Sequence, residues 1–197
     1  IDLGLSALVT LSTGEKVEPP RHYRTAQAKL RRQQRRASRR KRHSQRQKKA
    51  YRLVAKTHEK IANQRKTFAH ALSHRLTDTY SLIAVEDLNI LALAKSNLAK
   101  SVTDAAWSQL LMFLTYKAES AGGKVVKVDP RGTSQFCSGC GCRGPHKDLS
   151  VRVHRCPECG LVLDRDHNAA LNILHRALTP PVAGGQALTY PLRESVA

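Results

Sequence analysis

Residues 81–86 read Ser-Leu-Ile-Ala-Val-Glu, a short apolar run that ends in a carboxylate. Such a run is typical of a strand that is buried on both faces of a sheet. A second run, Lys-Val-Val-Lys-Val, occupies residues 124–128 and stops before an Asp-Pro turn signal. We therefore expect these two strands to form the centre of the fold.

Amphipathic stretches surround these runs. Residues 58–80 and the residues that follow Asp104 up to Gly122 carry apolar side chains near helical spacing. Asp166 has the position of an N-cap for a last helix through Leu178. Residues 1–18 predict an antiparallel hairpin with a turn at Thr13-Gly14. This order predicts an α/β fold in which helices flank a sheet.

The charge of the chain is strongly basic and unevenly distributed. The 197 residues carry a formal net charge of +19, and sixteen Lys and Arg residues, with no Asp or Glu, lie between Arg21 and Lys56. A polyanionic partner, most simply nucleic acid, is the expectation. No apolar stretch is long enough for a membrane span, and the start Ile-Asp-Leu-Gly lacks a secretory signal, so we expect a cytoplasmic protein.

The basic segment is rich in good helix formers and contains no Gly or Pro. We predict one long helix over 21–56 that lies antiparallel to a helix over 58–80. A merely solvated face and a disordered basic arm are the alternatives. Against phosphates the clustered charges become favourable through counterion release. The expected nucleic-acid contacts are Arg31, Arg32, Arg35, Arg36, Arg39, Arg40, Arg42 and Arg46.

Two Cys-x2-Cys pairs have the spacing of a four-cysteine zinc ribbon. Fifteen residues separate Cys137-Ser-Gly-Cys140 from Cys156-Pro-Glu-Cys159. Four thiolates would close the coordination shell, so the expected Zn²⁺ is structural. Disulfides are the alternative, which the missing secretory signal disfavours. Each Cys-x2-Cys pair forms a tight turn called a knuckle. Cys142 in place of Cys140 as a ligand would spoil the geometry of the first knuckle, so Cys142 is left out of the predicted site.

Three carboxylates stand at the ends of predicted elements. Asp2 lies in the first strand, Glu86 ends the buried run, and Asp166 starts the last helix. Such a set is typical of sites for hard divalent cations, and two ions there would clamp a phosphodiester. Spacing alone is a weak indication, and Asp164 competes with Asp166 for the third position.

Several motifs together resemble the transposon-encoded TnpB/OrfB family over about residues 1–178. They are Ile-Asp-Leu-Gly-Leu at 1–5, Ile-Ala-Val-Glu-Asp-Leu at 83–88, Thr-Ser-x-x-Cys-Ser-x-Cys-Gly at 133–141 and Cys-Gly-x-x-x-Asp-Arg-Asp-x-Asn-Ala-Ala at 159–170. The resemblance implies a RuvC-like nuclease core of the ribonuclease H type over 1–136, with the basic hairpin at 21–80. A zinc ribbon over 137–160, a third catalytic motif and last helix over 161–178 and a flexible tail over 179–197 would follow.

The resemblance also implies residue roles and partners. Asp2, Glu86 and Asp166 match the catalytic acids, which hold Mg²⁺ or Mn²⁺. The zinc ligands would be Cys137, Cys140, Cys156 and Cys159. Proteins of that family bind a guide RNA and cut the matching DNA. Because the chain begins at the first catalytic motif, we expect the family's N-terminal wedge and recognition modules to be absent from it.

Two other functional classes remain open from the sequence. A zinc-ribbon protein with a basic arm could coat DNA or RNA without cutting it. An inactive relic of a nuclease would bind DNA in the same way. The carboxylates separate these classes from an endonuclease, because a pure polyanion binder has reason to avoid acids near its binding face.

Overall fold

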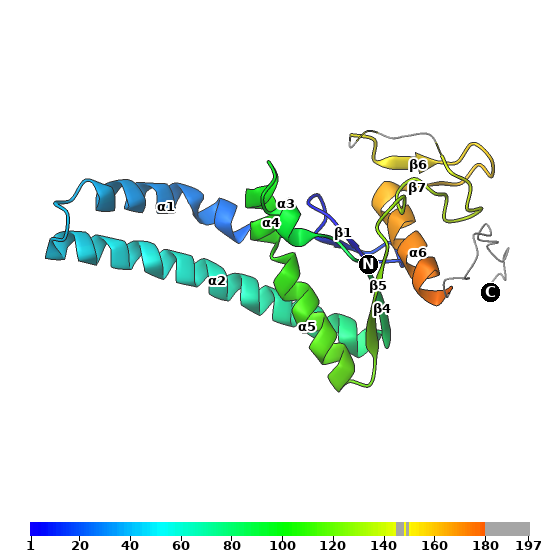
Figure 1. The fold of residues 1–197 in the computed structure, drawn as a ribbon, viewed down its shortest axis with the longest axis horizontal. Helices are drawn as coiled ribbons and strands as arrows, with labels where there is room; N and C mark the ends of the chain where they lie inside the picture. Colours follow the sequence, from blue (N-terminus) through cyan, green and yellow to red (C-terminus); the bar gives the residue numbers. More distant parts are fainter. Residues whose placement is uncertain (145–147, 149, 180–197) are drawn as a thin grey trace. The chain divides into compact units, whose positions relative to one another are not determined.

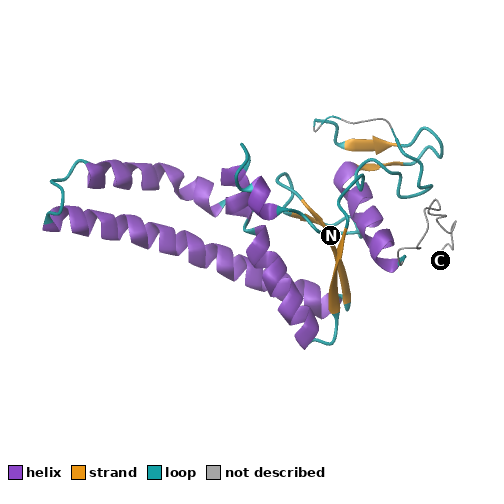
Figure 2. Ribbon diagram, in the orientation of Figure 1, coloured by secondary structure: helices purple, strands orange, loops and turns teal. Residues whose placement is uncertain are grey.

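The computed structural model describes residues 1–144, 148 and 150–179. Its chain divides into two compact units, one formed by residues 1–18, 81–88 and 122 onward, the other by residues 19–80 and 89–121. All described strands belong to the first unit, whereas the second is helical (Figures 1 and 2). The predicted tail over 179–197 falls, beyond Thr179, outside the described residues.

Within the described residues, the first unit contains three small sheets. Strands β1 (Asp2–Leu3), β2 (Val9–Thr10) and β3 (Lys16–Val17) are antiparallel, as the hairpin prediction required. Strands β4 (Leu82–Glu86) and β5 (Lys124–Val128) pair in parallel, with Glu86 opposite Val128. Strands β6 (Val153–Arg155) and β7 (Val162–Asp164) form an antiparallel hairpin. The described strands thus form separate sheets rather than one continuous sheet.

Helix α6 (Arg165–Leu178) organises the first unit. Ile173, which is fully buried, packs with Ala84 of β4 and Val128 of β5. The same helix also contacts β1 and β7. Strands β1 and β4 lie side by side, because the backbone nitrogen of Ile1 donates to the carbonyl of Ala84 at 2.8 Å. The prediction of helices packed against the central strands is confirmed here for α6.

The second unit is built on a helical hairpin. Helices α1 (His22–Ser38) and α2 (Gln45–Thr79) pack along a narrow apolar seam of Leu30, Ala37, Ala50 and Val54. Helices α3 (Ile90–Leu93), α4 (Ala99–Ala105) and α5 (Trp107–Ser120) complete the unit, and α5 packs against α2. In the part of the chain that is described, no helix is both long and apolar enough to cross a bilayer.

The predicted position of the hairpin turn is wrong. The chain turns at residues 39–44, not near residue 57, so the basic segment is shared between α1 and α2. Ser44 is the N-cap of α2 and its side chain accepts from the amide of Gln47 at 3.1 Å. The Gln47 side chain accepts in return from the amide of His43 at 2.8 Å. This Ser-x-x-Gln arrangement resembles a capping box and starts a new helix.

Candidate functional site

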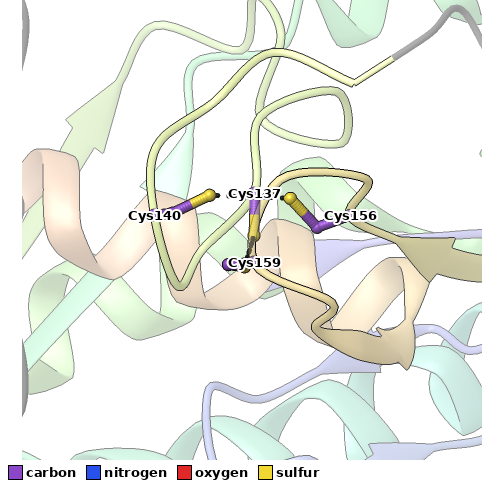
Figure 3. Close-up of side chains that lie close together, drawn as sticks. All are labelled: Cys137, Cys140, Cys156 and Cys159. Atoms are coloured by element: carbon purple, nitrogen blue, oxygen red, sulfur yellow. Dashed lines mark hydrogen bonds between the residues drawn. The ribbon is translucent and has the colours of Figure 1, made fainter.

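The four predicted cysteines meet at one point (Figure 3). Their sulfur atoms all lie within 4.8 Å of one another. Cys137 Sγ is 3.6 Å from Cys159 Sγ, and Cys140 Sγ is 3.5 Å from Cys156 Sγ. A tetrahedron of thiolates about 2.3 Å from a zinc ion has edges of about 3.8 Å. The cluster therefore has the size and donor set that a Zn²⁺ ion requires.

These distances exclude disulfides as the reason for the clustering. A disulfide has a sulfur–sulfur distance of about 2.05 Å, which is far shorter than either pair here. Cys142 is exposed and contributes only its carbonyl, which accepts from the amide of Cys137 at 2.9 Å. Its exclusion from the cluster agrees with the sequence prediction.

Tight turns point the thiols inward in both knuckles. The amide of Gly141 donates to the carbonyl of Cys137 at 2.8 Å, and that of Gly160 donates to Cys156 at 3.1 Å. Both glycines have positive φ angles, 74° and 71°, which other residues adopt at a cost. Burial acts against ionisation of Cys156, but the amides of Cys159 and Glu158 lower its pKa to about 7. At Cys156 these hydrogen bonds thus favour the thiolate, which is the form that binds metal.

The three predicted acids come from three elements of the first unit. Asp2 begins β1 and is half-buried, and Glu86 ends β4 with 7 % of its surface exposed. Asp166 is the second residue of α6, which contacts both strands. The carboxyl end of β4, where sequence reasoning put a ligand site, carries Glu86 as expected.

The charges of both Glu86 and Asp166 act on Asp2. Among the described residues, only the four cysteines bring their ligand atoms close enough together to hold one metal ion without a movement of side chains. Burial first, and then the negative charges of Glu86 and Asp166, raise the pKa of Asp2 to about 7. Attraction from the amino group of Ile1 and from Arg165 opposes this only in part. Burial also raises the pKa of Glu86, although a hydrogen bond from Thr133 acts in the opposite direction. Ionised together, the acids would repel one another unless a cation lay nearby.

The structure corrects the predicted cap of the last helix. The N-cap is Asp164, not Asp166: Asp164 Oδ1 accepts from the amides of Asp166 at 3.0 Å and His167 at 3.2 Å. Its other oxygen lies 2.8 Å from Nζ of Lys16. Burial would raise the pKa of Asp164, but the bond from Lys16 and the two amides hold it below its usual value. Both oxygens of Asp164 are therefore occupied, which leaves Asp166 as the better candidate for the third acid.

Most of the predicted arginines line one groove of the second unit. It has a volume of about 690 Å³ and its walls come mainly from α1. Its lining residues are Ala28, Arg31, Arg32, Arg35, Arg36, Arg39 and Arg40. Arg42 and Arg46 are exposed at the turn and the start of α2, outside this lining. Repulsion between such close cations is relieved by binding a polyanion.

Sequence reasoning missed a group of buried polar residues next to the acids. Thr133, Asn168 and Asn172 are each at most 4 % exposed. Asn168 and Asn172 lie one turn apart on α6 and bind the backbone that leads into the first knuckle. The spacing of two asparagines by four residues, among the apolar residues of an amphipathic helix, is the signal that could have identified them.

Comparison with known proteins places the chain in a family. Residues 1–97 match a family model described as "Probable transposase", and residues 107–173 match the "Cas12f1-like, TNB domain". A Streptomyces pristinaespiralis protein named "Putative RNA-guided DNA endonuclease" is 41 % identical across 99 % of this chain and 48 % of its own length. A "TnpB-like protein" of Acanthamoeba polyphaga mimivirus is 32 % identical across 64 % of this chain and 25 % of its own length. The chain belongs to the TnpB/OrfB family.

A solved structure agrees with this TnpB/OrfB assignment at the level of the fold. The protein in a Cas12f1-sgRNA-target DNA complex superposes with a TM-score of 0.63 and 17 % identity, over 88 % of this chain and 48 % of that one. The TnpB/OrfB chain spans about half the length of the Streptomyces relative and of an Escherichia coli relative named "Putative RNA-guided DNA endonuclease InsQ".

Proposed function

We propose that this chain is the nuclease part of an RNA-guided DNA endonuclease, with a RuvC-like fold of the ribonuclease H type. Asp2, Glu86 and Asp166 would be its metal-binding acids. The relatives' printed names support the reaction, and the resemblance supports the fold. The observation that carries the proposal is that three elements far apart in sequence, β1, β4 and α6, pack together and each brings one of these acids.

The donor set fits Mg²⁺ or Mn²⁺. Hard divalent cations prefer carboxylate oxygens. Burial, followed by repulsion from Glu86 and Asp166, raises the pKa of Asp2, and a bound cation would relieve that repulsion. Two such ions would supply an activated water and stabilise the leaving oxygen of a phosphodiester. Asp2 and Asp166 would hold the ions, and Glu86 would hold the second of them from the end of β4.

The two remaining features have supporting roles in this proposal. The cysteine cluster would bind a structural Zn²⁺, because four thiolates leave no open position for substrate. The arginine groove would hold the backbone of DNA or of a guide RNA without reading its sequence. The partners would therefore be a target DNA and a guide RNA.

Manganese binding tests the proposal on the full chain. We expect electron paramagnetic resonance to detect bound Mn²⁺ in the wild-type protein. Asp2→Asn should weaken that binding by about tenfold or more, because even the loss of a group that only orients a metal ligand lowers metal affinity by about that factor. Asp87→Asn is the matched control, because Asp87 follows Glu86 but is exposed and lies 3.3 Å from Lys127. If Asp2→Asn and Asp87→Asn bind Mn²⁺ equally, the chain is a zinc-ribbon polyanion binder.

A further inference from the structure

A short segment of the first unit joins the cysteine cluster to the acids. We name residues 133–138 the strap. It begins at Thr133, four residues before Cys137, and ends within the first knuckle at Ser138. Thr133 and Ser138 are 4 % and 7 % exposed, and Cys137 is fully buried. Both ends of the strap are therefore buried in the unit, whereas Ser134, Gln135 and Phe136 between them are partly exposed.

The first end of the strap contacts Glu86 directly. The hydroxyl of Thr133 donates to Glu86 Oε1 at 2.5 Å, in the range of a hydrogen bond to a charged oxygen. The carbonyl of Pro130, at 3.2 Å, is a more distant second acceptor for the same hydroxyl. Because Glu86 is the last residue of β4, its backbone is fixed by pairing with β5, and Thr133 fixes one of its two carboxylate oxygens.

The rest of the strap is fastened to helix α6. Asn172 Nδ2 donates to the carbonyls of Thr133 and Phe136, both at 2.7 Å. Asn168 Nδ2 donates to the carbonyl of Phe136 at 2.8 Å, and its Oδ1 accepts from the amide of Ser138 at 2.9 Å. Asn168 thus binds both neighbours of Cys137. The helix that carries Asp166 therefore also sets the positions of Thr133 and of the first knuckle.

We propose that Thr133 is a positioning residue for Glu86, and that the strap makes the geometry of the acids depend on the folded cysteine cluster. This inference rests on the proposed role of Glu86 as a metal-binding acid. Thr133 bonds Oε1 of Glu86, and in the described part of the chain no hydrogen bond uses the second oxygen, which could bind a cation. A zinc ion that orders the first knuckle would order Cys137, the strap and the Thr133 hydroxyl in turn.

Three substitutions test the role of the hydroxyl in the full chain. Thr133→Val removes it and keeps the shape of the side chain, whereas Thr133→Ser keeps it. Thr115→Val is the matched control, because Thr115 is exposed on α5 and bonds only its own helix, at Leu111. We expect Thr133→Val to weaken Mn²⁺ binding by about 10- to 100-fold, the range for groups that orient a metal ligand. Thr133→Ser and Thr115→Val should bind as the wild type does.

Zinc content and the unfolding temperature are measured on the same samples. A purely structural role for Thr133 would lower the unfolding temperature, and Mn²⁺ binding would fall only with it. The proposal instead requires weaker binding at unchanged zinc content and folding. If Thr133→Val does not fold, Thr133→Ala replaces it in the same comparison.

The outcomes separate this inference from the function on which it rests. If Asp2→Asn abolishes Mn²⁺ binding while Thr133→Val binds normally, the positioning role is wrong and the acidic site stands. If Asp2→Asn has no effect, the acidic site itself is wrong. Weakened Mn²⁺ binding in both variants, with recovery in Thr133→Ser, is the result that supports both.

Discussion

The carboxylate of Asp104 lies 2.9 Å from a guanidinium nitrogen of Arg65, and this ion pair joins α4 to the middle of α2. Asp104 also accepts from the amides of Tyr23 at 2.8 Å and Arg24 at 3.2 Å. These amides belong to the first turn of α1, which has no side-chain cap of its own. One buried acid therefore fastens both helices of the basic hairpin at its base.

We expect Asp104→Asn to destabilise the second unit. The change leaves Arg65 without its counter-ion, which typically costs about 3 kcal/mol for a buried pair. Urea unfolding measures the decrease in stability. Glu119→Gln, at an exposed position of α5, is the control and should change stability by less than about 0.5 kcal/mol. Equal stability of the two variants would show that the pair does not support the hairpin.

Metal content tests the cysteine cluster. The wild-type chain should bind one zinc ion, and Cys140→Ser should lose it, because one of four thiolates is then missing. Cys142→Ser should retain the full content, since Cys142 is exposed and outside the cluster. Atomic absorption on the purified proteins gives the result. Retained zinc in Cys140→Ser, or its absence from Cys142→Ser, would refute the assignment.

The stability of the protein without added divalent cations should depend on pH through Asp2. Its pKa is about 7 in the folded chain against 3.8 for an unperturbed Asp, so between these values the folded state keeps a proton that the unfolded state has released. Its contribution to stability therefore disappears as the pH rises from about 4 to about 7. Unfolding midpoints at pH 5 and pH 8 measure this decrease.

Asp2→Asn should make the two midpoints more alike, because the amide does not titrate. Asp87→Asn, at an exposed position, should keep the wild-type difference. If Asp2→Asn leaves the difference between the two midpoints as it is in the wild type, the raised pKa of Asp2 is contradicted.

Binding to duplex DNA should depend on salt through the arginine groove. Arg35→Gln with Arg39→Gln should reduce the slope of log affinity against log salt by about 0.9 for each phosphate that the groove no longer neutralises. Lys124→Gln with Lys127→Gln removes the same charge from exposed positions on β5 and is the control. If both pairs reduce the slope equally, the effect reports net charge and not the groove.

Much of the fold follows from local patterns in the sequence. Apolar runs identified β4 and β5, and helical spacing identified α5 and α6, because each pattern reports burial of one element. The two Cys-x2-Cys pairs identified the thiol cluster, since a knuckle is fixed by residues close in sequence.

Two predictions were wrong: where the basic helix ends and which acid caps α6. In the first, dense charge hid a helix start, and in the second, two neighbouring acids could both have been the cap. The dense charge over 21–56 hid the Ser44 and Gln47 signal that starts α2. Two acids stood at the start of α6, and the bonds from the amides of Asp166 and His167 show that Asp164 is the cap. The ion pair of Asp164 with Lys16, which is distant in sequence, could not be predicted from a local pattern. The burial of Asp104 likewise depends on Arg65 and α1, which no local pattern reveals.

A crystal grown with Mn²⁺ provides the sharpest test of the three-acid site. Anomalous scattering at the manganese edge should place metal in contact with carboxylate oxygens of Asp2, Glu86 and Asp166, with Thr133 still bound to the other oxygen of Glu86. Manganese bound elsewhere, or these three side chains directed apart with no metal between them, would contradict the proposed site.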